Sequence, residues 1–474
     1  MEIHSVIGLA LLVMLASTVM GTLIVWSGFF HTHVLVLPYL LVFFVFTQST
    51  IGVIGVQQTS FSVYDRGAGL LFFSWLIWVL WILSGISLIR DKLLRIPTVD
   101  CSVRPWFVAL LLLFLAHTCV GLALGISAKN SMSAQGLINI VNMGLLTLLM
   151  LRTVHSRKTL ELLIWSGLIV IAARDLFGMG RFLFFGGDPA NPYDNAYYAL
   201  GAKLTFFDIN DSLLASIAAA YCGFRLLHDH YSLSRAQKWF FASLTLLAVA
   251  TIVFSLRRTA WGGLALVGAL IVLLAPAGKR LALSIPIGVV LVAGLGVLFS
   301  QRLSVAWERA QVGWGALYYD LVGGAHYGQA SLRALELQLA WQAYLDSPIF
   351  GQGPWGKFAA YSGFGETWHG GEGAFGFVHS GVLHILFKSG LVGFALFCGL
   401  LFSFLMFVKR TYPVLEPRYR AVLVMGAAGL LFMVPDFLFG TPVIELRTTQ
   451  LMGLCFALPY LAYKIKQSAE SKAS

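Results

Sequence analysis

The sequence predicts an all-α membrane protein, a polytopic bundle of about 12–13 transmembrane helices with one large extracytoplasmic loop that contains amphipathic helices. Hydrophobic residues make up 58% of the 474 residues and charged residues only 11%, whereas a soluble domain carries about 25% charged residues. Apolar stretches of about 20 residues recur, each long enough to cross about 30 Å of hydrocarbon as a helix. These stretches are continuous and do not alternate as membrane β-strands do, so helices are the expected spanning element.

The apolar stretches define about thirteen candidate membrane helices. They lie near residues 6–26, 34–56, 68–89, 106–126, 135–151, 160–177, 205–227, 239–256, 259–275, 281–299, 380–408, 421–439 and 448–463. The first stretch has no basic segment before it and no clear cleavage site, so we expect it to be retained as a helix. The five cysteines lack metal-ligand spacing, so we expect neither a zinc site nor a disulfide framework.

Lysine and arginine gather in alternate loops, which predicts the orientation of the helices. The cations of these loops are Arg90, Lys92, Arg95, Arg104, Arg152, Arg157, Lys158, Arg225, Arg235, Lys238, Lys279, Arg280, Lys409, Arg410, Arg418 and Arg420. We therefore expect these loops and the C-terminus in the cytoplasm, and the cation-poor loops, above all 300–378, on the other side. The net charge of +11 then reflects topology, and no nucleic-acid partner is expected.

We divide the chain into four regions by this pattern. Residues 1–238 are the N-terminal transmembrane helices, 239–299 the central helices, 300–378 the outer loop, and 379–474 the C-terminal helices and tail. The outer loop is rich in aromatic residues, so we expect it to be packed. Its segments 302–319 and 331–345 look helical, and in the second Leu332, Leu335 and Leu339 share an apolar face.

Arg257 and Arg258 form the first candidate site, between two apolar stretches on the outer side. Two arginines at membrane depth are costly, and a guanidinium binds phosphate oxygens with two parallel hydrogen bonds. The structural alternative is that both side chains extend to lipid headgroups. Neighbouring residues on a helix point about 100° apart, so we expect one of the two to face a site.

Two further candidates lie in or next to the outer loop. Arg333 lies on the amphipathic segment 331–345, where a surface ion pair with Glu336 is the structural alternative. His379 precedes an apolar helix that Ser380 or Gly381 begins. The positive end of a helix disfavours the imidazolium, so a neutral His379 can serve as a general base. The alternative is an interfacial residue that caps the helix.

Other charges near the outer helix ends have simpler interpretations. Lys388 lies nine residues into its helix and should face protein or water rather than lipid. A local ion pair explains Arg174 and Asp175, and Asp436 next to Pro435 has no evident partner. These residues are not predicted to carry chemistry.

Three motifs resemble, in order, those of the O-antigen ligase and Wzy-type polymerase superfamily. Residues 254–261 read Phe-Ser-Leu-Arg-Arg-Thr-Ala-Trp, similar to its Ser-x-Ser-Arg-Gly-x-Trp segment. Residues 333–341 and the turn 346–353 resemble its loop helix and Pro-Leu-Phe-Gly-x-Gly turn. Residues 377–393, with His-Ser and then Gly-Leu-Val-Gly, resemble its final helix. Arg257 stands where the family has a second serine, and the alignment of Trp261 favours Arg258 as the family arginine.

The resemblance implies an enzyme of the bacterial inner membrane with its active site on the periplasmic face. The implied reaction moves a glycan from undecaprenyl diphosphate to an acceptor sugar hydroxyl, without metal or cofactor. His379 is then the general base, and Arg258, Arg333 and Arg257 bind the diphosphate. The acceptor is lipid A core for a ligase, or a growing polysaccharide for an O-antigen or exopolysaccharide polymerase, and we lean slightly to the ligase. The partners are these glycans and membrane lipid.

The alternative function is a transporter or flippase for lipid-linked oligosaccharide. That class predicts inverted repeats, broken helices and ionisable residues near the membrane midplane. No internal repeat is evident, and the charges gather at the outer face, which favours the transferase.

Overall fold

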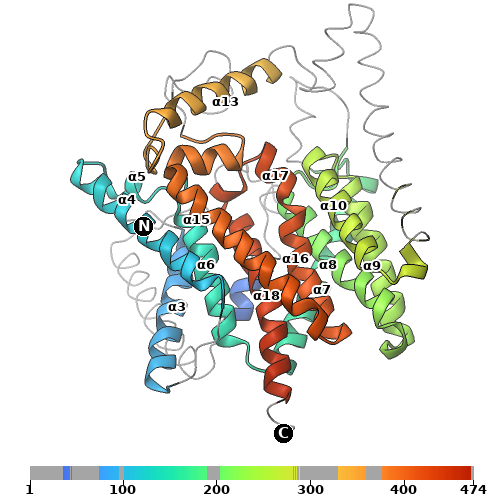
Figure 1. Cartoon of the computed structure of the whole chain (residues 1–474). Helices are drawn as coiled ribbons and strands as arrows, with labels where there is room; N and C mark the ends of the chain where they lie inside the picture. Colours follow the sequence, from blue (N-terminus) through green and yellow to red (C-terminus); the bar gives the residue numbers. More distant parts are fainter. Residues whose placement is uncertain are drawn as a thin grey trace, which may run out of the picture.

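A computed structural model describes residues 36–42, 44, 74–95, 101–188, 203–280, 282, 284, 288, 329–358 and 376–470. Within these ranges the chain forms α-helices and short 3₁₀ turns and no β-strand, which confirms the predicted all-α class. The helices stand side by side as a bundle, and α13 lies across one end of it (Figure 1). The candidate segments 6–26 and 302–319, and most of 34–56 and 281–299, lie outside the described ranges.

The remaining predicted stretches all contain helices. The α-helices are α3 (Trp75–Leu93), α4 (Arg104–Ala123), α5 (Ala128–Ser131), α6 (Ile138–Thr153), α7 (Arg157–Phe184), α8 (Ile209–His228), α9 (Arg235–Val253), α10 (Arg258–Leu274), α13 (Gln329–Leu345), α15 (Gly381–Thr411), α16 (Pro417–Phe432), α17 (Val434–Phe439) and α18 (Leu446–Glu470). The 3₁₀ turns are η3 (His230–Ser232), η4 (Tyr412–Val414) and η5 (Pro442–Ile444).

Several helices begin at a side chain that accepts a hydrogen bond from the first turn. Ser156 caps α7, Ser234 caps α9 with a reciprocal bond from Gln237, and Ser380 caps α15. Asp208 caps α8 and accepts the N–H of Asn210 at 2.9 Å. Such caps satisfy backbone donors that a helix start leaves without an intrahelical partner, so polar residues at these places fix where each helix begins.

Five helices among the described residues are long and apolar enough to cross a membrane. They are Arg104–Ala123, Arg157–Phe184, Arg235–Val253, Gly381–Val414 and Pro417–Phe439. On α15 large apolar side chains such as Leu391, Phe402 and Leu405 are exposed, as expected of a surface that faces lipid. By contrast α18, which is less apolar, is buried along most of its length and forms the centre of the bundle. The chain is therefore a multi-pass membrane protein.

The basic loops share one end of the bundle. Arg90, at the end of α3, donates a 3.0 Å hydrogen bond to the carbonyl of Arg152, at the end of α6. Lys464, near the end of α18, donates to the carbonyl of Leu151 at 2.6 Å. The C-terminus lies at this end, and α13 at the opposite end (Figure 1). The structure thus separates the basic loops from the outer-loop helix, as the alternation of charges predicted.

Candidate functional site

His379 is held by a carboxylate from the outer-loop helix. Glu336 of α13 accepts hydrogen bonds from the backbone N–H of His379 at 2.8 Å and from its ring atom Nδ1 at 2.9 and 3.0 Å. The Glu336 side chain is 4% exposed and that of His379 is 20% exposed. The ring of Phe377 packs edge-on against the imidazole, 5.1 Å between centroids. The histidine is therefore fixed in position while part of it reaches the surface.

This contact determines which ring nitrogen of the neutral histidine carries the proton. A carboxylate only accepts hydrogen bonds, so the proton lies on Nδ1 and the lone pair lies on Nε2. When Nε2 takes a proton, the carboxylate stabilises the positive charge that the ring gains. A histidine oriented in this way by a buried acid has the arrangement of a general base.

Glu336, the partner of His379, is the candidate site residue that the sequence reasoning did not single out. Glu336, Ala340 and Tyr344 are buried, and Leu339, on the predicted apolar face, is partly buried beside them. Ala340 packs with three other buried residues, Phe358, Val378 and Phe387. The available signal was the spacing of Glu336, Ala340 and Tyr344, which puts a carboxylate on one helix face with two less polar residues. Glu336 is buried and bonds to His379, and the alternative of an ion pair with Arg333 involves a side chain outside the described part of the structure.

Arg333 lies on the same helix, one turn before Glu336. Its backbone is helical, as predicted, and its side chain lies outside the described part of the structure.

The motif 254–261 folds as a sharp junction between α9 and α10. Leu256 has φ 55°, in the left-handed region that residues other than glycine seldom adopt. Ser255 donates its hydroxyl to the carbonyl of Ile252 at 2.7 Å, and the Trp261 indole donates to the carbonyl of Val253 at 3.2 Å. Both bonds satisfy carbonyls at the end of α9 that no longer have a helical partner. The serine and tryptophan of the motif therefore stabilise the turn that presents the arginines.

The two arginines of the junction have different surroundings. The guanidinium of Arg257 donates to the carbonyl of Phe207, lies 5.1 Å from the centre of that ring, and forms a 3.7 Å ion pair with Asp436. Asp436, which had no evident partner in the sequence, is thus paired with Arg257. Arg258 is the first residue of α10 and is exposed. Arg257 is therefore fastened to Phe207 and Asp436, and Arg258 is exposed at the N-terminus of α10.

The short helix α17 and the turn after it connect the arginine junction to His379. Asp436 of α17 pairs with Arg257. Phe437, the next residue, packs so closely on Gly381 that a Cβ there would lie 2.9 Å from its ring. Thr441 donates its hydroxyl to the carbonyl of Val378, next to His379, at 2.6 Å. The starts of α10 and α15 are thus held on the two sides of α17.

The turn after α13 is inserted into a break in α15. Gly390 has φ 63° and ψ −167°, which interrupts the helix. Leu391 and Val392 donate their N–H groups to the carbonyls of Pro348 and Ile349 at 2.8 and 3.0 Å. A Cβ on Gly390 would collide with the Ile349 carbonyl. The turn 346–353 and the Gly-Leu-Val-Gly segment, which are about 40 residues apart in sequence, are therefore two halves of one joint that fixes α13 over α15.

Lys388 completes this joint from inside the protein. It is 1% exposed, and its ammonium donates to the carbonyls of Pro354 and Gly356 at 3.1 and 2.6 Å. The prediction that Lys388 faces protein rather than lipid is confirmed. It holds the chain that leaves the turn 346–353 against α15.

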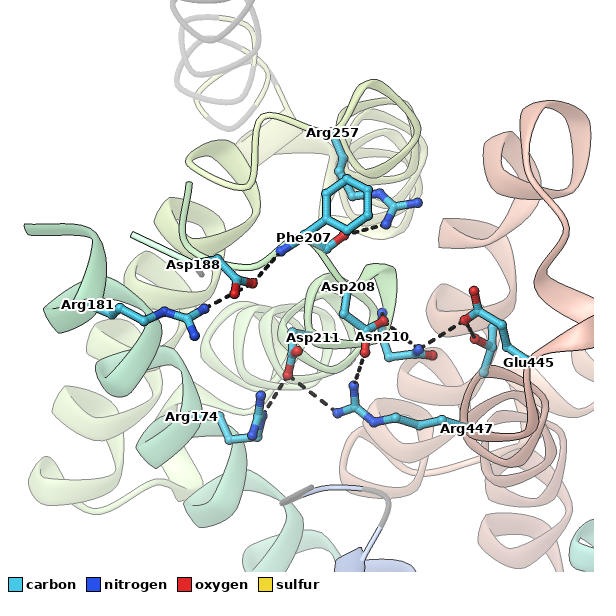
Figure 2. Close-up of polar contacts among 11 residues, drawn as sticks. Arg174, Arg181, Asp188, Phe207, Asp208, Asn210, Asp211, Arg257, Glu445 and Arg447 are labelled. Atoms are coloured by element: carbon cyan, nitrogen blue, oxygen red, sulfur yellow. Dashed lines mark hydrogen bonds and ion pairs between the residues drawn. The ribbon is translucent and has the colours of Figure 1, made fainter. Parts of the chain in front are cut away.

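A buried network of ion pairs lies beside the arginine junction (Figure 2). Arg174 of α7 pairs with Asp211 of α8 at 2.6 Å, and Arg447 of α18 pairs with Asp208 at 2.7 Å. The sequence predicted a local ion pair of Arg174 with Asp175, whereas the Arg174 guanidinium forms its 2.6 Å pair with Asp211 on the next helix. The network fastens α7, α8 and α18 to one another beside the arginine junction.

Comparison with known proteins supports the family suggested by these motifs. Residues 243–398 match the family model described as O-antigen ligase. This confirms the resemblance to that superfamily and places His379, Arg257, Arg258 and Arg333 inside the matched region. No curated protein sequence matches the chain. The matched region contains the arginine junction, the loop helix and the first part of α15.

Proposed function

We propose, on the premise that residues 243–398 form an O-antigen ligase domain, that this protein is a membrane glycosyltransferase. It moves a glycan from undecaprenyl diphosphate to a sugar hydroxyl on the periplasmic face of the bacterial inner membrane. The observation that carries the proposal is the hydrogen-bonded pair of Glu336 and His379, which α17 and Thr441 connect to a junction with two arginines.

The acceptor hydroxyl is activated by His379. As its oxygen attacks the anomeric carbon of the donor, the hydroxyl proton passes to Nε2 of His379, and Glu336 stabilises the charged ring. The bond between the anomeric carbon and the diphosphate oxygen breaks, and its electron pair leaves with undecaprenyl diphosphate. The new glycosidic bond forms in the same step, so the enzyme needs no covalent intermediate.

The diphosphate gains negative charge as it leaves, and cations on the outer face stabilise it. Arg258 is exposed on the first turn of α10, where backbone N–H groups and the helix dipole also favour an anion. Arg333 on α13 is the second cation. Arg257, fastened to Phe207 and Asp436, keeps this junction in place.

The acceptor distinguishes the two possible glycosyltransferases, a ligase and a polymerase. A ligase joins the glycan to lipid A core, and a polymerase joins it to another repeat unit on its lipid carrier. We favour the ligase. The donor diphosphate, the arginines and the base are the same in both reactions.

Purified full-length protein, given undecaprenyl-diphosphate-linked repeat units, tests the proposal. Lipid A core is added in one reaction and omitted in another, and products are separated by gel and mass spectrometry. A glycan joined to lipid A core supports the ligase, and longer chains that remain on the carrier support the polymerase. Donor that crosses vesicles with no new glycosidic bond would contradict transfer and indicate a flippase.

A further inference from the structure

The two residues that hold Arg257, Phe207 and Asp436, lie before and after the matched region 243–398, and Phe207 belongs to the N-terminal half of the chain. The Phe207 carbonyl accepts from the Arg257 guanidinium, and the Phe207 ring lies beneath it at 5.1 Å (Figure 2). A carbonyl and an aromatic face both attract a cation, so Phe207 fixes the guanidinium from two directions.

Phe207 is itself held by a buried carboxylate. Asp188 accepts the N–H of Phe207 at 2.8 Å on Oδ2, the same oxygen that pairs with Arg181 at 3.1 Å. The Asp188 side chain is fully buried, and its backbone N–H donates to the carbonyl of Leu204 at 2.9 Å. Separation of such a buried pair is costly, because it leaves a charge in the protein interior without its partner.

The same segment is fastened to the arginine junction along a second path. Thr205 donates its backbone N–H to the carbonyl of Phe254, inside the motif, at 3.0 Å. Its hydroxyl donates to the carbonyl of Thr251 at 2.8 Å. The segment 204–207 thus lies between Asp188 and the end of α9, so a shift of Asp188 is transmitted to the turn that carries the arginines.

We infer that Asp188 is a positioning residue for the donor-binding arginines: through Phe207 it fixes Arg257 and, with it, the start of α10 that carries Arg258. The inference rests on the proposed function. It assigns to the N-terminal half of the chain a part in binding the diphosphate. It also explains why Arg257 stands where the family motif has a serine, since this chain supplies a carbonyl and a ring to receive it.

Binding of undecaprenyl diphosphate to the purified full-length protein tests the inference, with undecaprenol as the uncharged probe. We expect Asp188→Asn, which keeps the size but removes the charge that pairs with Arg181, to weaken undecaprenyl diphosphate binding by about tenfold. Binding of undecaprenol should not change. The matched control is Asp91→Asn, which removes a carboxylate from a buried 2.6 Å pair with Arg90 at the opposite end of the bundle. The control should leave both affinities unchanged.

A double-variant comparison separates positioning from general damage. If Asp188 acts through Arg257, Asp188→Asn adds no further loss to Arg257→Lys, because the two changes remove one interaction. Independent, additive losses would overturn the inference. A preserved affinity in Asp188→Asn would overturn it as well.

Phe207 provides a test that leaves the buried ion pair intact. Phe207→Leu removes the ring but keeps the backbone carbonyl, and should weaken diphosphate binding, whereas Phe207→Tyr keeps the ring and should restore it. Equal binding by the two variants would contradict the role of Phe207. If the wild-type protein binds undecaprenol as tightly as undecaprenyl diphosphate, the proposed function fails, which is a different result from failure of the Asp188 variants alone.

Discussion

Replacement of Glu336 by glutamine removes the charge that orients His379 and leaves the size of the side chain almost unchanged. In the wild-type protein Glu336 accepts three hydrogen bonds from His379, between 2.8 and 3.0 Å. The glutamine oxygen can still accept the backbone N–H. Its amide group then faces Nδ1 as a donor, which favours the ring tautomer with the proton on Nε2. That tautomer cannot take a proton from the acceptor sugar.

The expected loss follows from the contribution of a general base. Such a residue contributes about 10²–10⁴ in rate, or about 2.7–5.4 kcal/mol of the barrier. We expect Glu336→Gln to lower kcat within this range, because the Glu336 side chain is almost fully buried and water does not replace its hydrogen bonds. The assay is single-turnover transfer from lipid-linked donor to acceptor by purified protein.

Binding of undecaprenyl diphosphate is the control for this experiment. It should be the same in wild type and Glu336→Gln, because Glu336 does not touch the donor phosphates in the proposed reaction. A Glu336→Gln enzyme with wild-type kcat would refute the orientation of His379 by Glu336. A loss of donor affinity that accounts for the whole decrease in rate would refute it too.

Three further predictions concern the joint and the arginines. Gly390→Ala should destabilise the protein by at least about 1–2 kcal/mol, because it forces a left-handed conformation on alanine. Gly223→Ala is the control and should not destabilise it, since no atom lies within 4 Å of a Cβ added there. Thermal unfolding in detergent compares the two variants. Lys388→Met should leave the buried carbonyls of Pro354 and Gly356 without a donor, which should lower the free energy of unfolding by about 1–3 kcal/mol. We therefore expect faster proteolysis after residue 353. An unchanged cleavage rate would contradict the role of Lys388 in the joint. Arg258→Lys keeps the positive charge but cannot form the two parallel hydrogen bonds of a guanidinium to phosphate. Titration with undecaprenyl diphosphate should therefore show an affinity lower by about tenfold. Equal affinities of the two proteins would contradict phosphate binding by Arg258.

The helices were predictable because the membrane imposes a simple pattern on the sequence. A continuous apolar stretch forms a helix in lipid, so the stretches 106–126 and 160–177 coincide with most of α4 and with the middle of α7. The predicted pair 239–256 and 259–275 is confirmed as α9 and α10. Ser380 caps α15, as its position before an apolar run indicated. The break at Gly390 was not predicted, because it depends on the turn 346–353 that fills it.

The candidate site was predictable in its individual residues but not in their partners. His379 and the arginine pair could be recognised from motif and position. Glu336 could not be joined to His379, because the two are 43 residues apart and only the fold of the outer loop brings them together. The same holds for Arg257 and Asp436, and for Arg174, whose partner lies on the next helix. Long-range ion pairs depend on helix packing, which local sequence patterns do not encode.

The central claim is that His379 removes the acceptor proton during glycan transfer. The most direct measurement is single-turnover transfer by wild-type and His379→Ala protein in lipid vesicles, with saturating undecaprenyl-diphosphate-linked donor. Donor binding and thermal unfolding of each protein establish that both are folded. The account predicts that His379→Ala binds donor normally and loses transfer by at least about 10². Transfer by His379→Ala at the wild-type rate would contradict it.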